Sequence, residues 1–425
     1  MEQKNQRTNL YGWFFFCFYL YILASLLTEM CAKWYYVKVM KRISNSNILF
    51  IHRVLKGIAD AIISVFIPLI IYKQTGNLVL SFVFIAVQRT SMCFYGAFFK
   101  KFIRSHPVIC ITFHFIPAVI SQLLLLTSLY WPIIILLGLL AGMTNIFYYM
   151  GLQFMFGFVD KPSNTAKISI AAATGKIIFT LISAYIIGNI KESLVFVIIA
   201  SCAFYVISVI PLMARHKEFG KMIVINESQS LKETLKKGKW FYFYEMCFGT
   251  AHMLITTVLP LFLYYSGLSF TKAGILIAMQ DLINILGNVF AHFSVKKGKV
   301  KFMMIFSSAL VFVSILLIIF VRDMYVIYAL SIIASFAIQS HSTASFELFI
   351  KHQKPLGIYQ DSLFYWEISL NFARAMTIVH FIFLQAFPII FAISLAGSVG
   401  MATFGCAIDS NYNVAKNSPA ELSNA

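Results

Sequence analysis

The pentapeptide PLIIY at residues 68–72 recurs as PLFLY at residues 260–264, an offset of 192 positions. The same offset aligns FIAVQR at residues 84–89 with LIAMQD at residues 276–281. Coincidences among Leu, Ile and Phe are common in an apolar chain, but matched Pro, Tyr and Gln at a single offset are not. The chain therefore contains an internal repeat that covers two apolar segments and the loop between them.

The composition of the 425-residue chain excludes a soluble globular protein. Hydrophobic residues make up 60% of the chain and charged residues 12%, and the mean hydropathy is +0.81. Soluble domains are about half apolar and about a quarter charged. We therefore expect an all-α polytopic protein of the cytoplasmic (cell) membrane, with the lipid bilayer around apolar runs of about 20 residues, the length that crosses it.

Thirteen such apolar runs follow one another along the sequence. They are residues 10–31, 48–72, 78–99, 108–129, 132–156, 168–187, 194–213, 240–265, 273–293, 302–321, 324–349, 363–385 and 388–408. The first run lies outside the repeat. We interpret residues 1–47 as one extra N-terminal hydrophobic helix followed by a basic interfacial segment, with an interfacial helix or a signal peptide as the alternatives.

The basic excess of the chain is unevenly distributed. Lys and Arg outnumber Asp and Glu by 34 to 16, for a formal net charge of +18. Of the basic residues, 22 lie in alternate gaps between apolar runs and 4 in the intervening gaps. Cytoplasmic loops are enriched in Lys and Arg, so this excess is a topology signal and indicates no nucleic-acid partner. It places a linker at residues 214–239 and a loose polar tail at residues 409–425 in the cytoplasm.

The repeat also sets the domain organisation. It aligns the second apolar run with the eighth, so each copy contains six helices. Because six is even, both copies begin on the same side of the membrane, as in transporters built from parallel repeats. We expect an N-terminal six-helix bundle at residues 48–213 and a C-terminal six-helix bundle at residues 240–408, related by a pseudo-twofold axis.

This plan resembles that of the major facilitator superfamily (MFS) over about residues 48–408. Members of that family usually carry G-x3-D-R-x-G-R-K after their second helix, and this chain reads GAFFKKFIRS at residues 96–105. Gly96 and Arg104 match the pattern, whereas Lys100 replaces the acid. The resemblance implies a secondary transporter that works by alternating access, and we expect it to be a monomer.

Ten ionisable residues lie at span depth, where such groups are costly and usually functional. They are Arg53, Lys56, Asp60, Arg89, Lys176, Glu245, Asp281, Glu347, Glu367 and Arg374. The expected N-terminal bundle is mostly basic at these positions and the C-terminal bundle mostly acidic. The resemblance implies that the second helix packs on the eleventh and the fifth on the eighth, which brings Arg89 near Glu367 and Lys176 near Asp281. Such pairs either hold the bundles together or break between access states.

Polar neighbours complete the candidate substrate-binding and coupling site. Lys56 and Asp60 are four positions apart on one helix face. Glu367, Asn371 and Arg374 form a stripe along another helix. The candidates are Lys56, Asp60, Gln88, Arg89, Lys176, Glu245, Gln280, Asp281, Glu367, Asn371 and Arg374. For the repeat-matched Gln88 and Gln280, a hydrogen bond between helices is the alternative to substrate contact.

The sequence shows no nucleotide-binding, metal-ligand or nucleophile–base motif, so we expect no enzyme activity, no cofactor and no metal site. A cavity with one basic and one acidic wall suits a small-molecule substrate that is polar or zwitterionic. We therefore expect a secondary active transporter coupled to protons or another ion. The alternatives are an exporter of amphipathic drugs or lipids, and a non-transporting membrane scaffold or sensor with the same fold.

Overall fold

The computed structural model describes residues 45–159, 162–190, 193–215, 218–219, 230–353, 359–384 and 386–417. Within these ranges almost every residue lies in a helix or in a short turn between helices. The predicted extra helix at residues 10–31 lies outside the described residues, as do residues 220–229 of the predicted linker and residues 418–425 of the tail.

The helices are named in chain order. They are α3 (Asn45–Ile62), η1 (Ser64–Phe66), α4 (Ile67–Thr75), α5 (Leu78–Phe98), α6 (Lys100–Ser105), α7 (Pro107–Phe113), α8 (Phe115–Leu124), α9 (Trp131–Val159), α10 (Pro162–Asn189), α11 (Leu194–Ala214), α13 (Leu231–Met253), η2 (Leu254–Val258), α14 (Leu259–Tyr265), α15 (Phe270–Lys296), α16 (Val300–Phe320), α17 (Met324–Gln353), α18 (Tyr359–Leu384) and α19 (Phe387–Asn417). Among the described residues, 11 continuous helical segments are long and apolar enough to cross a membrane, and a shorter one, Ala173–Asn189 in α10, accompanies them. The chain is therefore an integral multi-pass membrane protein.

The two repeat-matched prolines interrupt their spans at equivalent places. Pro68 and Pro260 lie in the first turns of α4 and α14, where a missing N–H is tolerated. A 3₁₀ turn at η1 precedes the first, and a π-helical turn at η2 precedes the second. Because proline cannot donate to the preceding turn, the sequence repeat produces a change of helix type in both spans.

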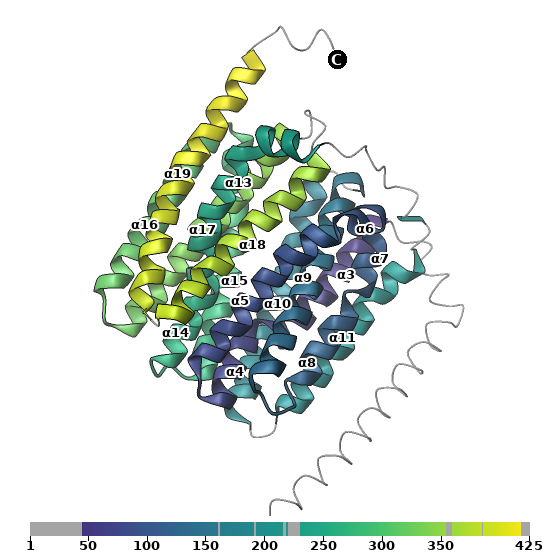
Figure 1. The fold of residues 1–425 in the computed structure, drawn as a ribbon, viewed down its shortest axis with the longest axis vertical. Coiled ribbons are helices and arrows are strands. Elements are labelled where there is room, and N and C mark those ends of the chain that lie inside the picture. Colours follow the sequence, from purple (N-terminus) through teal and green to yellow (C-terminus); the bar gives the residue numbers. More distant parts are fainter. Residues whose placement is uncertain are drawn as a thin grey trace, which may run out of the picture.

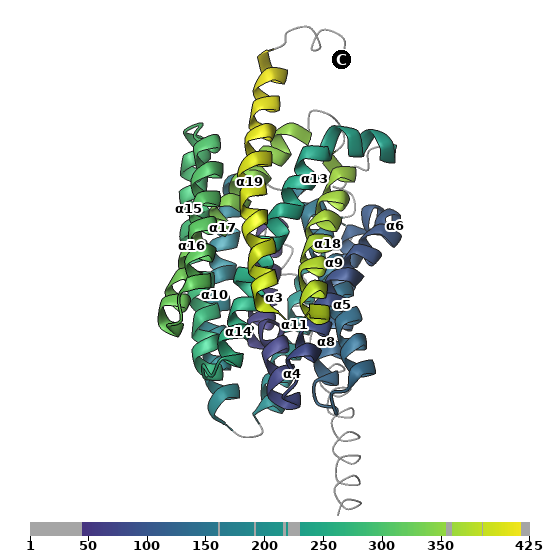
Figure 2. The same ribbon diagram turned by 60° about the vertical axis from the view of Figure 1, so that its left-hand side comes forward.

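The helices form two groups that lie side by side (Figures 1 and 2). We call α3 to α11 the N-terminal group and α13 to α19 the C-terminal group. Between the groups, α10 packs along α15 and α5 packs along α18. Within them, α3 packs on α10 and α11, while α13 packs on α18 and α19. These contacts are compatible with a repeat of six helices.

The last helix is longer than the sequence indicated. α19 runs to Asn417 and projects beyond the other helices (Figure 1), so the prediction of a loose tail from residue 409 is wrong as far as residue 417. No Gly or Pro lies between residues 406 and 417, and the next helix-breaking residue is Pro419. A polar composition therefore did not end the helix.

Two glycines lie at close contacts between α10 and α15. A Cβ added to Gly274 would lie 2.1 Å from the Cβ of Ala184, and one added to Gly188 would lie 2.4 Å from Thr271 Oγ1. Small residues allow helices to come this close in membranes. We call the end of the molecule where α11 ends and α13 begins the linker end. The close contact lies toward the opposite end, near the end of α10 and the start of α15.

Candidate functional site

An ion pair joins α10 to α15 across the interface between the two groups. Lys176 Nζ lies 2.8 Å from Asp281 Oδ1, and the two side chains are 29% and 14% exposed. The predicted proximity of these residues is confirmed. Asp281 Oδ2 is buried and accepts no hydrogen bond from the described residues, so the carboxylate keeps one oxygen for a further donor.

The second predicted pair is replaced by a network of amides. Glu367 on α18 accepts hydrogen bonds from Gln153 Nε2 on α9, at 2.9 Å, and from Asn371 Nδ2, at 3.2 Å. Arg89 on α5 donates to Asn371 Oδ1 at 3.4 Å. In the described part of the chain Arg89 and Glu367 form no direct ion pair. The two residues lie near each other as predicted, but the Asn371 amide bonds to both and bridges them, so they do not meet directly.

Arg374 lies two turns from Glu367 on the same face of α18. Its side chain is buried, with 9% of the residue exposed, and it interacts electrostatically with Arg89, Glu367 and Glu245. Glu245, on α13, is 1% exposed. The Arg374 guanidinium forms neither a hydrogen bond nor an ion pair with the residues that the structure describes, and its Nε is fully enclosed.

Lys56 and Asp60 form another charged group, inside the N-terminal helices. Lys56 Nζ lies 2.5 Å from Asp60 Oδ2, as their spacing on one helix face predicts. It also lies 3.9 Å from the centre of the Tyr148 ring, a cation–π contact. Tyr205 on α11 donates a hydrogen bond to Asp60 Oδ1. Lys56 is 3% exposed and Asp60 21%, so the carboxylate is the accessible member of the pair.

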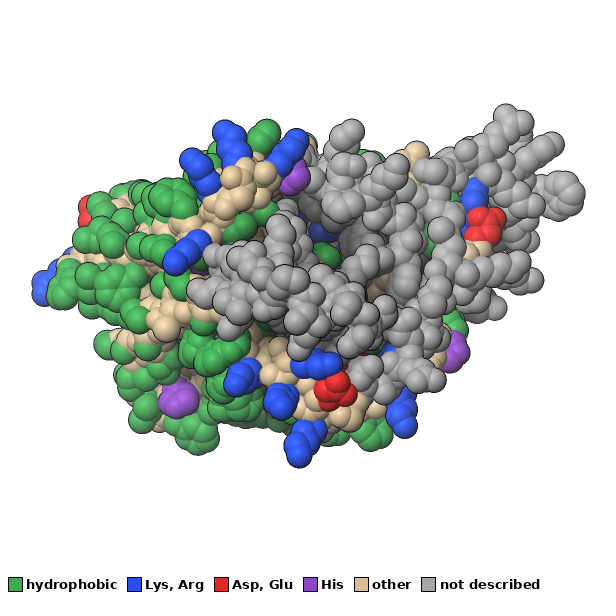
Figure 3. Space-filling model, turned by 90° about the horizontal axis from the view of Figure 1, so that it is seen from above, with side chains coloured by type: hydrophobic (Ala, Val, Ile, Leu, Met, Phe, Trp, Pro, Cys, Tyr) green, Lys and Arg blue, Asp and Glu red, His purple; other side chains and the backbone are tan. Residues whose placement is uncertain are grey.

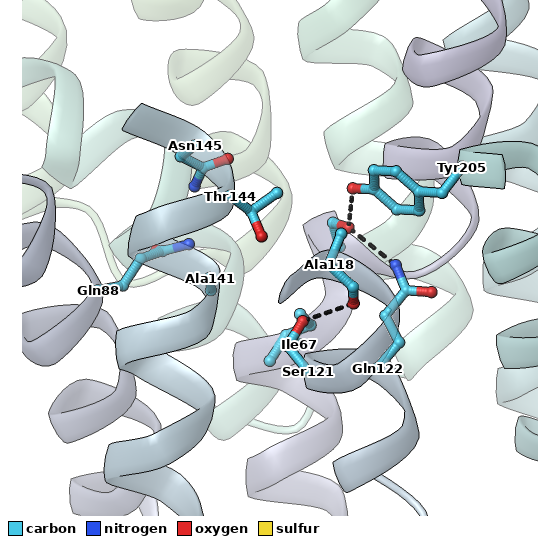
Figure 4. A pocket seen from close by; sticks show the side chains of 10 residues that line it. Ile67, Gln88, Ala118, Ser121, Gln122, Ala141, Thr144, Asn145 and Tyr205 are labelled. Atoms are coloured by element: carbon cyan, nitrogen blue, oxygen red, sulfur yellow. Dashed lines mark hydrogen bonds between the residues drawn. The ribbon is translucent and has the colours of Figure 1, made fainter. Parts of the chain in front are cut away.

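A polar cavity adjoins this group (Figure 4). Gln88 and Asn145 line one side of it, and Tyr205 and Gln122 line the other. Ser64 Oγ lies 3.1 Å from the Tyr205 hydroxyl and accepts a hydrogen bond from Gln122 Nε2 at 3.4 Å. Gln88 therefore lines a cavity inside the N-terminal group, and not one at the interface between the groups.

Gln280, the repeat partner of Gln88, has a different environment. Its Nε2 donates to the backbone carbonyl of Ile255 at 3.0 Å. In the π register of η2, Leu259 N donates to Leu254 O, so Ile255 O would need the N–H of residue 260, which is a proline. Gln280 thus satisfies a carbonyl that the helix leaves without a donor. This is the hydrogen bond between helices that was the alternative to substrate contact.

Three charged residues join α6, which follows directly after α5, to α18 at the linker end, and we call them the α5–α18 charge cluster. Asp361, in the first turn of α18, lies 2.8 Å from Lys100 Nζ and 3.0 Å from Arg104 Nη1. The Asp361 side chain is 2% exposed. The sequence analysis did not select these residues as a site. Its one signal was the basic Lys100 where the family usually has an acid, and the structure shows the acid on α18 instead.

Aromatic rings pack between the groups at the opposite end. The rings of Phe82 and Phe381 are 4.0 Å apart between centroids, and those of Tyr72 and Tyr264 are 5.6 Å apart. Tyr72 and Tyr264 are also equivalent positions of the sequence repeat. Two equivalent residues can contact each other only near the twofold axis that relates the copies. α5 is therefore joined to α18 by rings at one end, and α6, which follows α5, is joined to α18 by charges at the other.

Basic side chains gather around the linker end of the molecule. Figure 3 views this end and shows Lys and Arg side chains around its rim. At the helix ends on this side of the molecule, Lys101, Lys236, Lys297 and Lys299 are exposed. This is the distribution that the topology prediction requires of a cytoplasmic face.

Comparisons with known proteins identify the fold. No protein-family profile matches the chain, and no curated protein matches it in sequence. Among solved structures, a bacterial homologue of the iron transporter ferroportin in its outward-facing state is 12% identical, with a TM-score of 0.67 over 87% of this chain and 100% of that one. The inward-facing state gives 11% identity and a TM-score of 0.60 over 86% and 98% of the two chains. A mutant of the peptide transporter POT in complex with sulfate is 10% identical, with a TM-score of 0.64 over 86% and 94%.

The chain has the major facilitator fold. The outward-facing form of the ferroportin homologue overlays with the higher TM-score of its two states. At these identities the likeness concerns the fold, and the function must be argued from the charged groups of this chain.

Proposed function

We propose that the protein is a secondary active transporter that moves a small polar or zwitterionic metabolite across the cytoplasmic membrane by alternating access. The observation that carries the proposal is the ion pair between Lys176 and Asp281, which joins the two groups of helices inside the membrane-spanning region. Charges at such depth are costly unless they are paired or used. A contact that spans two rigid groups can form in one access state and break in the other.

The substrate class follows from the signs of the interfacial charges. Lys176, Arg89 and Arg374 supply positive charge between the groups, and Asp281 and Glu367 supply negative charge. A substrate that carries both signs can replace protein partners on both sides. The peptide transporter among the structural neighbours supports this class, because a peptide is itself zwitterionic. The ferroportin homologue suggests a metal ion as the alternative cargo.

Asp60 is our candidate for proton coupling. Its carboxylate is the more accessible member of the pair and accepts hydrogen bonds from both Lys56 and Tyr205. Protonation would cancel the charge that holds Lys56, and the lysine would then need another partner. Uptake of one proton would thus change the contacts of α3 with α11.

Flux through proteoliposomes tests the proposal. The full chain is reconstituted with a trapped pH-sensitive dye, and labelled amino acids, dipeptides or ferrous iron are offered with and without a pH gradient. We expect zwitterion flux that the gradient accelerates. Asp60→Asn should keep substrate exchange but lose the response to the gradient, whereas Asp323→Asn at an exposed loop should behave as wild type. Flux of iron alone, or no flux of any probe, would contradict the proposal.

A further inference from the structure

We infer that Arg89 and Arg374 form a binding site for the anionic group of the substrate, a carboxylate or a phosphate. This inference rests on the proposed transport function and names the chemistry by which the substrate is held. Arg89 is on α5 and Arg374 on α18, so the site would be shared between the two groups of helices.

Both guanidinium groups have buried donors without acceptors. A guanidinium has five N–H donors and stays charged under all physiological conditions. Arg374 is nine-tenths buried, yet it forms no hydrogen bond with the described residues. Arg89 has two long contacts, to Asn371 Oδ1 at 3.4 Å and to Met92 Sδ at 3.7 Å, and its Nε is also buried without a partner. Buried donors without hydrogen-bond partners are costly in a protein interior.

Glu367 is the acid that interacts electrostatically with both arginines. Glu367 could neutralise the guanidinium groups, but both of its oxygens already accept hydrogen bonds from amides, Oε1 from Gln153 and Oε2 from Asn371. Amide donors leave the negative charge in place while occupying the lone pairs that face them. The two arginines therefore feel the field of Glu367 without being hydrogen-bonded to it.

The two cations are neighbours across the interface. Arg89 donates to Asn371 Oδ1 and Arg374 lies about one turn further along the same helix, so the two guanidinium groups repel each other. Two like charges with free donors between two packed helices attract an oxyanion, because planar guanidinium groups bind carboxylate and phosphate with paired hydrogen bonds. Such a ligand would satisfy donors from both groups of helices at once. It would also link substrate occupancy to the approach of α5 and α18.

Thermal stability of the purified full chain in detergent, followed by tryptophan fluorescence, tests the site without requiring transport. The probes are succinate and inorganic phosphate, with succinamide as a neutral analogue and sodium chloride at equal ionic strength. A ligand that binds only the folded state raises the melting temperature. We expect one or both anions to raise it by about 2 °C or more, and succinamide and chloride to leave it unchanged. The responding anion identifies the group as a carboxylate, a phosphate or either.

Variants separate this binding site from a structural role. Arg374→Gln should abolish the shift caused by the anion, and a cooperative melting transition of its ligand-free form shows that the variant still folds. Arg89→Gln should weaken the apparent affinity for the anion at least tenfold, measured as the anion concentration that gives half of the maximal shift. The matched control is Arg322→Gln, at an exposed position between α16 and α17, which should keep the full shift.

Three outcomes would overturn the inference. They are no stabilisation of the wild type by either anion, an undiminished shift in both Arg374→Gln and Arg89→Gln, and equal shifts with succinamide. The proposed transport function has separate outcomes. Flux with no anion-dependent stabilisation would overturn the site alone, whereas stabilisation with no flux of any probe would overturn transport alone.

Discussion

Lys176 Nζ lies 2.8 Å from Asp281 Oδ1, and this ion pair connects α10 of one helix group with α15 of the other. The two residues are 105 positions apart in sequence, and their helices also meet through the Gly274 contact. The pair therefore lies on one of the two main contact surfaces between the groups, where any relative rotation of the groups must act on it.

Neutralising one member of this pair should lower the free energy of unfolding more than neutralising both. Lys176→Gln or Asp281→Asn leaves one charge uncompensated, and the cost should approach but not reach the roughly 3–5 kcal/mol of a fully buried pair, since Lys176 is 29% exposed. The double variant should recover most of the loss of unfolding free energy. The charge swap, Lys176→Asp with Asp281→Lys, should recover folding as well. Thermal denaturation in detergent measures all four.

The control for this cycle is the pair of Glu233 and Lys237 at the start of α13. Its atoms are 2.6 Å apart, but its side chains are 43% and 37% exposed. Exposed helix pairs contribute about 0.3–0.5 kcal/mol, so Glu233→Gln should change little. Equal effects in the two pairs would mean that Lys176 and Asp281 are solvated and hold nothing together.

The sequence predicted contacts that depend on which helices pack together, but not contacts that depend on the rotation of a helix by a fraction of a turn. Lys176 and Asp281 meet because α10 and α15 are neighbours. Arg89 forms no direct ion pair with Glu367 because the amide of Asn371, on the same face of α18, hydrogen-bonds to both residues. Gln280 instead donates to a carbonyl that the π register of η2 leaves without a backbone donor. A π turn adds one residue to a helix, and periodicity analysis assumes that no residue is added.

The acid of the α5–α18 charge cluster was missed for another reason. Asp361 lies just before an apolar run, where an acidic residue reads as an ordinary end of a helix. Its partners Lys100 and Arg104 read as topology charges. Nothing in the spacing along the chain relates residues more than 250 positions apart, so only the packing of α5 on α18 brings this cluster together.

Gly274→Ala should force α10 and α15 apart. The added Cβ would lie 2.1 Å from the Cβ of Ala184, which is attached directly to a helix backbone and cannot rotate away. Overpacking of this kind costs about 1–3 kcal/mol. We expect a lower melting temperature and weaker packing of the two groups at the end opposite the linker.

Gly96→Ala is the matched control for that variant. Its Cβ would meet Ile146 Cδ1 at 3.4 Å, an ordinary contact, and alanine favours a helix over glycine by up to about 1 kcal/mol. Gly96→Ala should therefore leave the melting temperature unchanged or raise it. A loss of stability in Gly96→Ala equal to that in Gly274→Ala would contradict the close-approach argument.

Cysteine labelling can test the topology with two serines that flank one span. Ser230 caps α13, and Ser266 follows α14. The helical segment between them, Lys232–Tyr265, is long enough to cross the membrane. In a cysteine-free background, an impermeant maleimide applied to intact cells should modify Ser266→Cys and leave Ser230→Cys unmodified until the cells are permeabilised. The reverse pattern would place the linker outside the cell.

Asp361→Asn should open the linker end of the interface between α5 and α18. The substitution keeps the shape of the side chain but removes the charge that Lys100 and Arg104 share. Losing one partner of a buried ion pair typically costs about 3–5 kcal/mol, so we expect a clear fall in melting temperature. The control Asp323→Asn should cause none, because Asp323 accepts backbone hydrogen bonds from Tyr325 and Val326 that an asparagine oxygen can also accept.

A thiol in the same interface can show whether Asp361→Asn separates α5 from α18 or only lowers the stability of the protein. Cys93 on α5 donates to the backbone carbonyl of Ile368 on α18 at 3.4 Å. With Cys93 as the only cysteine, separation of the two helices removes this contact and exposes the thiol. Asp361→Asn should therefore raise the rate of maleimide labelling at Cys93 several-fold below the melting temperature, and Lys100→Gln added to Asp361→Asn should return part of the lost stability by removing one stranded cation. If labelling is unchanged while the melting temperature falls, the α5–α18 charge cluster holds the helices together in every state and does not control access.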